Sequence, residues 1–119
     1  MRDSNVTFTN LDANEQHAFV ALVRLMIRAD GRFTAPEVDA LMRLAERLGR
    51  PRFWSLMNES VSLFPTRQDV LRLAGAVERL QVRAWIVRTL TDLAAVDGVH
   101  PREDDLLEQL TYLWHRQAP

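Results

Sequence analysis

The sequence predicts an all-α protein, a bundle of six to seven helices built from two pseudo-repeated helical hairpins. Apolar residues recur at helical spacing along most of the chain, and no stretch alternates with a period of two for long enough to indicate a sheet. In addition, two parts of the chain, each containing an Asp-Gly pair, repeat one another. These observations together favour a helical bundle with internal pseudo-symmetry.

The first predicted helix extends from about Leu11 to Ala29. Asp12, followed by Glu15 three residues later, has the pattern of a capping box at its start. Asp30-Gly31 ends the helix, because a glycine just beyond the last turn adopts the left-handed conformation at little cost.

The second predicted helix begins directly after this turn. Thr34 is the expected N-cap, Pro36 lies in the first turn where no amide hydrogen is needed, and Glu37 completes a second capping box. Gly49 and Pro51 end the helix. Its expected buried stripe consists of Val38, Leu41, Leu44, Ala45 and Leu48.

Two shorter helices occupy the middle of the chain. The segment from Pro51 to Ser60 predicts the first of them, and Pro65 separates it from the second. Thr66 and Asp69 have the spacing of an N-cap and its acidic partner, so the second helix begins there and continues to Ala74.

Two longer helices complete the bundle. One runs from about Leu80 to Val96 and ends at Asp97-Gly98, and the other begins at Pro101. The residues expected on their buried sides are Trp85, Ile86, Thr89, Leu90, Leu93, Leu106, Leu107, Leu110, Leu113 and Trp114.

The internal repeat aligns Asp30-Gly31 with Asp97-Gly98. Apolar positions of the first helix then match those of the fifth, and Glu37 meets Glu103 once one residue is deleted from the second copy. The protein is therefore predicted to hold two helix–turn–helix units, each with one acid at the turn and another in the first turn of the following helix. We assign residues 1–10 to an N-terminal tail and residues 11–116 to one domain.

Composition excludes several functional classes. The 119 residues have 47% hydrophobic content and a formal charge of −1, which indicates one globular domain without a global field that attracts nucleic acid. There is no cysteine, and every basic residue is an arginine, so thiolate and lysine chemistry are both excluded. No apolar run is long enough to span a membrane, and no secretory segment is visible, so we expect a cytoplasmic protein.

The acidic turns have two interpretations. Asp30, Glu37, Asp97 and Glu103, with His100 between the last two, could bind a divalent cation such as Ca²⁺, Mg²⁺, Mn²⁺ or Zn²⁺. A complete EF-hand is excluded because apolar and basic residues occupy the first ligand positions of such a loop. Alternatively, the same acids are helix caps that accept hydrogen bonds from backbone amides. The sequence leaves both interpretations open.

The two turns resemble a known family. Ala29–Glu37 (Ala-Asp-Gly-Arg-Phe-Thr-Ala-Pro-Glu) and Val96–Glu103 (Val-Asp-Gly-Val-His-Pro-Arg-Glu) are similar to the paired A-D-G…E hairpins of the TerB-like tellurite-resistance family. The similarity extends from about Asp12 to Trp114. It implies an all-helical domain with metal-binding turn acids, in bacterial stress, phage-defence or envelope-associated systems. Val96 replaces the usual alanine, and the second turn is one residue short.

A basic cluster is the second candidate surface. The cluster at the end of the second helix consists of Arg43, Arg47, Arg50 and Arg52, and Trp54 follows in the next helix. These arginines either complement the helix dipole or dock an acidic protein partner, and an exposed Trp54 could anchor an interface, including that of a homodimer.

The sequence contains no enzyme motif. Its three histidines lack zinc-site spacing, and no serine lies in a nucleophile elbow. We therefore expect a non-catalytic interaction or sensing module, monomeric or homodimeric, that binds a protein partner and no nucleic acid. The alternative is a purely structural adaptor whose turn acids are caps and whose arginine faces or tryptophan bind the partner.

Overall fold

The computed structural model describes residues 8–28, 35–95 and 101–116, excluding the side chains of residues 9, 28, 101–104 and 116. This part of the chain contains six α-helices, a short 3₁₀ helix and no strand, which confirms the predicted fold class. The elements are η2 (Phe8–Asn10), α1 (Ala13–Arg28), α2 (Ala35–Leu48), α3 (Arg50–Leu63), α4 (Arg67–Gly75), α5 (Leu80–Ala94) and α6 (Pro101–Arg116).

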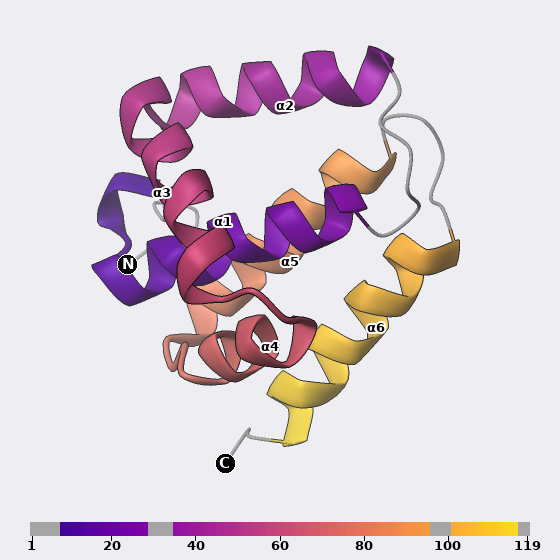
Figure 1. Cartoon of the computed structure of the whole chain (residues 1–119). Helices are drawn as coiled ribbons and strands as arrows, with labels where there is room; N and C mark the ends of the chain where they lie inside the picture. Colours follow the sequence, from indigo (N-terminus) through magenta and orange to yellow (C-terminus); the bar gives the residue numbers. More distant parts are fainter. Residues whose placement is uncertain (1–7, 29–34, 96–100, 117–119) are drawn as a thin grey trace.

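Helix α1 is the centre of the bundle. It packs against α3, α4 and α5, and every residue from Ala18 to Arg24 is buried. A helix that is apolar around most of its circumference must be covered on several sides, which explains this central position. The ring of Phe19 lies 4.8 Å from that of Trp85 and 6.2 Å from that of Phe8, centroid to centroid. Figure 1 shows α1 and α5 passing through the middle, with α2 above them and α6 along one side.

Two predicted capping boxes are present. The amide of Glu15 donates to Asp12 Oδ1 at 2.8 Å, and the amide of Asp12 donates to Glu15 Oε1 at 2.9 Å. At the start of α4, Thr66 and Asp69 exchange the same pair of hydrogen bonds. Thr34, the predicted cap of α2, lies outside the described residues.

The predicted helix boundaries differ from the structure mainly at α3. This helix continues to Leu63, three residues beyond the predicted end at Ser60. It ends there because Pro65 keeps the preceding residue out of the helical region, and Phe64 accordingly has non-helical backbone angles, φ −133° and ψ 68°. Between α2 and α3 the chain turns at Gly49, whose φ of 97° favours glycine.

The predicted N-terminal tail contributes to the core. Phe8 is buried against Phe19, and its carbonyl accepts a hydrogen bond from the side chain of Gln16. The packed structure therefore begins at least three residues before Leu11. Within the described ranges, no helix combines the length and the hydropathy needed to cross a membrane.

The internal repeat is visible in the burial pattern. Phe19 and Ile86 are both buried at matching positions of α1 and α5, as are Leu44 and Leu110 in α2 and α6. The two copies pack differently, however. Helix α6 contacts its own partner α5 and also α4, whereas α2 packs mainly against α3 and α5. The contact between α2 and α5 joins the two halves of the repeat and creates the groove described next.

An arginine-lined groove between two helices

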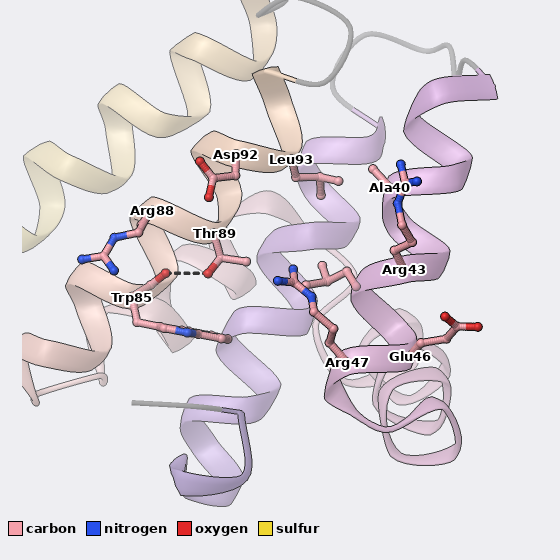
Figure 2. A pocket seen from close by; sticks show the side chains of 10 residues that line it. Ala40, Arg43, Glu46, Arg47, Trp85, Arg88, Thr89, Asp92 and Leu93 are labelled. Atoms are coloured by element: carbon pink, nitrogen blue, oxygen red, sulfur yellow. Dashed lines mark hydrogen bonds between the residues drawn. The ribbon is translucent and has the colours of Figure 1, made fainter. Parts of the chain in front are cut away.

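A groove of about 760 Å³ lies between α2 and α5. This volume is within the range of ligand-binding clefts. Among the described residues, all those that line it belong to these two helices (Figure 2). They are Ala40, Arg43, Leu44, Glu46 and Arg47 of α2, and Trp85, Arg88, Thr89, Asp92 and Leu93 of α5.

The floor of the groove is apolar and well supported. Leu44 and Leu93 are buried, and the half-buried ring of Trp85 packs against Phe19 of the central helix. The hydroxyl of Thr89 donates to the backbone carbonyl of Trp85 at 2.8 Å. The floor therefore consists of side chains fixed by the core, and the half-buried Trp85 is the one of the three that offers most apolar surface to anything that enters the groove.

Three arginines line the groove. Figure 2 shows Arg47 reaching from α2 toward α5, Arg43 extending along α2, and Arg88 on the side of α5 that is farther from α2. The guanidinium groups are therefore well separated, with that of Arg47 between the two helices and that of Arg88 beyond α5. Such an arrangement fits a ligand with several separated anionic groups better than a single small anion.

These arginines differ from the others in the described part of the chain. Within that part, Arg43, Arg47 and Arg88 form neither a hydrogen bond nor an ion pair, whereas every other described arginine side chain has a partner. Those partnered arginines are Arg24, Arg50, Arg52, Arg67, Arg72, Arg79 and Arg83. All the described arginines that make no such contact thus line one groove.

Two acids at the margins limit the positive charge of the groove. Glu46 points outward from α2 and pairs with Arg50 at 3.7 Å, an exposed pair that contributes little stability (Figure 2). Asp92 lies on α5 one helical turn after Arg88, yet no ion pair joins the two. The central cation, Arg47, has neither acid directed toward it in Figure 2.

The structure brings together only part of the predicted partner-binding set. Arg43 and Arg47 line the groove, whereas Arg50 and Trp54 do not. Trp54 is exposed on α3, where its ring packs edge-on against Phe53. The sequence analysis did not identify Arg88, because an arginine four residues before an aspartate has the pattern of an ordinary helical ion pair. Only the packing of α2 on α5 identifies Arg88 as part of the site.

The predicted metal ligands are mostly outside the described residues. Asp30, Asp97 and His100 fall in undescribed segments, and the side chain of Glu103 is likewise not described. Glu37 is described, and it is buried in the first turn of α2. The described residues include no group of three or more histidine or acidic side chains that could hold a metal ion. The cation hypothesis therefore stays a prediction.

A second hollow, of about 550 Å³, lies between α5 and α6. Its described lining contains no arginine and includes Val87, Leu107 and the exposed Tyr112. The two hollows share helix α5 but differ in chemistry, so the second hollow is an internal control for the first.

Comparison with known proteins identifies one family. The family model described as tellurite resistance protein TerB matches residues 16–115, which include both hollows and all six α-helices except the first three residues of α1 and the last residue of α6. No curated protein and no solved structure matches the chain significantly.

Proposed function

This chain belongs to the TerB family, and from that premise we propose that it is a non-catalytic interaction module that holds a protein partner in the groove between α2 and α5. The proposal includes a cytoplasmic location and a role in a bacterial stress or envelope-associated system, both of which rest on the family resemblance. The observation that supports the groove as the binding surface is the set of Arg43, Arg47 and Arg88, which make no polar contact within the described part of the protein.

The physical argument concerns the use of arginine. An arginine with a fixed carboxylate or carbonyl partner stabilises the fold. Arg43 and Arg47 lie one turn apart on α2 and repel one another, and neither they nor Arg88 makes such a contact within the described residues. Arginine is also enriched among residues that dominate the energy of protein interfaces. An anionic partner would supply hydrogen-bond acceptors for these arginines, so we expect the groove to bind an anionic surface of another molecule.

The experiment is site-specific photo-crosslinking in the native host. Benzoylphenylalanine is placed at Glu46, on the margin of the groove, and at Tyr112, beside the second hollow, as the position control. We expect a discrete protein adduct at position 46 that is absent at position 112. The adduct disappears when Arg43, Arg47 and Arg88 are all changed to Gln.

A charge-matched variant makes this experiment specific. Arg52, Arg67 and Arg72 are exposed arginines that already have partners elsewhere on the protein, so R52Q/R67Q/R72Q removes the same charge without altering the groove. The adduct at position 46 is expected to persist in this variant. Equal loss of the adduct in both triple variants would mean that net charge, rather than the groove, holds the partner.

A divalent cation at the acidic turns is the second candidate. The C-terminal ends of α1 and α5 and the N-terminal ends of α2 and α6 lie at the same end of the bundle in both views (Figures 1 and 2). The two walls of the groove, α2 and α5, each adjoin one of the predicted acidic turns. An ion bound at these turns would therefore act on the spacing of α2 and α5, and its occupancy would be coupled to partner binding.

Thermal unfolding tests this second candidate. Chelator-treated protein is melted with and without millimolar Ca²⁺, Mg²⁺, Mn²⁺ or Zn²⁺, because an ion that binds the folded state raises the midpoint by mass action. A rise in the wild type that is absent in D30N/D97N supports a metal-dependent module. If no ion raises the midpoint, the turn acids are caps and the chain is a purely structural adaptor that still binds through its arginine face.

A further inference from the structure

We propose that the occupant of the α2–α5 groove is an acidic amphipathic helix of the partner protein. Its apolar face lies on the half-buried ring of Trp85, which the buried Leu44 and Leu93 flank, and its carboxylates face Arg43 and Arg47 on the α2 side. The inference rests on the proposed function, since it specifies the chemistry of the ligand that the groove accepts.

The dimensions of the groove favour a helix. Its lining extends from Ala40 to Arg47 on one wall and from Trp85 to Leu93 on the other. At a rise of 1.5 Å per residue these stretches are about 10–12 Å long, which corresponds to about two helical turns of a ligand. An amphipathic helix uses such a trough by placing apolar residues at positions i, i+3, i+4 and i+7 on the floor.

The distribution of charge determines which flank of that helix is acidic. The α2 wall contributes Arg43 and Arg47, and its acid Glu46 points outward and pairs with Arg50 (Figure 2). The α5 wall contributes both Arg88 and Asp92. The α2 wall is therefore the more positive of the two. The electrostatic contribution to binding is therefore most favourable when the Asp or Glu residues of the ligand helix face α2 and its side facing Asp92 is neutral.

The same features argue against a nucleic acid as the occupant. A phosphate backbone meets a basic surface with polar groups, whereas the floor here is formed by buried leucines and a tryptophan. Asp92 would also repel a phosphate strand that followed the α5 wall. The chain as a whole has a formal charge of −1, so it lacks the basic field of most nucleic-acid binders.

Selection from a peptide library tests the proposal directly. A displayed library of 14-residue peptides with helix-favouring fixed positions is selected on the full chain, after depletion on R43Q/R47Q/R88Q. We expect enrichment of sequences with apolar residues at i, i+3, i+4 and i+7 and with Asp or Glu along one flank. A peptide with the selected sequence is then synthesised, labelled and titrated by fluorescence anisotropy.

We expect the groove variants to change the affinity for this peptide in opposite directions. R43Q/R47Q/R88Q weakens binding of this peptide by about tenfold or more, because each partly exposed charge pair contributes only a few-fold. R52Q/R67Q/R72Q leaves the affinity within about twofold. Asp92→Asn strengthens binding by about twofold, since it removes an acid facing an acidic ligand. If the triple groove variant melts at a lower temperature than wild type, the single variant Arg47→Glu replaces it in the same titration.

Several results overturn the proposal. One is the absence of any enrichment that depends on the groove, and another is enrichment of basic or uncharged peptides. A third is that single-stranded DNA or anionic phospholipid vesicles bind more tightly than the peptide and that their binding also depends on Arg47. These outcomes are separate from failure of the proposed function. A groove-dependent crosslink to a partner without an acidic helix would preserve the interaction module and remove only the ligand chemistry proposed here.

Discussion

Arginine has opposite roles at two places in this bundle. Near the start of α1, Arg79 donates to both oxygens of Glu15, at 2.6 and 2.8 Å, and to the carbonyl of Asn10 at 3.0 Å. Glu15 is almost fully buried there, so the ion pair ties the segment before α5 to the start of the central helix. In the α2–α5 groove, by contrast, Arg43, Arg47 and Arg88 have no such acceptors within the described residues.

The two groups of arginines, those with acceptors in the fold and those lining the groove, have different roles. Arg24 shows the same behaviour as Arg79, because it is buried in the central helix and donates to the carbonyls of Ser60 and Phe64 at the end of α3. Arg83 donates to the carbonyl of Val77 and lies 5.8 Å from the centre of the Trp114 ring. The arginines that join one element to another donate to acceptors within the fold. Those at the groove are available to a second molecule.

The largest expected effect comes from breaking the Glu15–Arg79 pair. Arg79→Ala leaves a buried carboxylate without its charged donor, and we expect a loss of about 2 kcal/mol in the free energy of unfolding. This value is below that of a fully buried pair because the Arg79 side chain is 43% exposed and water can replace part of its contact. Urea denaturation followed by circular dichroism measures the difference.

Arg47→Ala is the matched change in the groove. We expect the free energy of unfolding to change by no more than about 0.5 kcal/mol, as for an ordinary surface substitution. If Arg47→Ala destabilised the protein as much as Arg79→Ala, the groove arginines would have a structural role and the contrast between the two regions would fail.

A smaller effect is expected from acid. The hydrogen bonds from Arg79 hold the pKa of Glu15 below its ordinary value of 4.5, against the opposing effect of burial. The unfolded chain therefore binds a proton at Glu15 at a higher pH than the folded chain does. Stability from this pair is complete above the unfolded-state pKa and is lost as the pH falls through the folded-state value.

Glu15→Gln separates this contribution from general acid unfolding. The variant is expected to be less stable than wild type at pH 7, and the difference is expected to shrink as the pH is lowered below 4.5. Urea denaturation at a series of pH values provides the comparison. A difference that stays constant across that range would show that the charge of Glu15 does not contribute to folding.

Most of the fold could be predicted from local sequence signals. Capping boxes at Asp12 and Thr66, together with helical spacing of apolar residues, located all six α-helices, because these signals act within one or two turns. The missed features depended on longer-range packing. Phe8 is buried only because the ring of Phe19 faces it, and α3 extends to Leu63 because Pro65 sets its limit.

The candidate site could be predicted only in part. Arg43 and Arg47 are identifiable because they lie one turn apart on the polar side of one amphipathic helix. Arg88 is distant in sequence, and no local pattern indicates that α5 packs beside α2 rather than elsewhere. The packing of α5 beside α2 depends on how the two copies of the repeat are arranged. The copies are similar in sequence but pack differently, so the repeat alone does not predict this contact.

The smallest expected effect has the opposite sign to the loss of Arg79. Arg43 and Arg47 are four residues apart on α2, and like charges at this spacing destabilise a helix by about 0.3 kcal/mol. Arg43→Gln removes the repulsion and keeps nearly the same helix propensity, so we expect the free energy of unfolding to rise by about 0.3 kcal/mol at low ionic strength. Arg47 is less suitable for this test because it lies in the last turn of α2, where a cation is favoured by the helix dipole. In 0.5 M salt the difference between wild type and Arg43→Gln is expected to vanish, since the repulsion is screened.

The two possible outcomes distinguish binding from folding. If Arg43→Gln stabilises the fold but weakens binding of the selected peptide, the groove retains Arg43 for binding. If Arg43→Gln destabilises the fold at both ionic strengths, Arg43 stabilises the fold as Arg79 does.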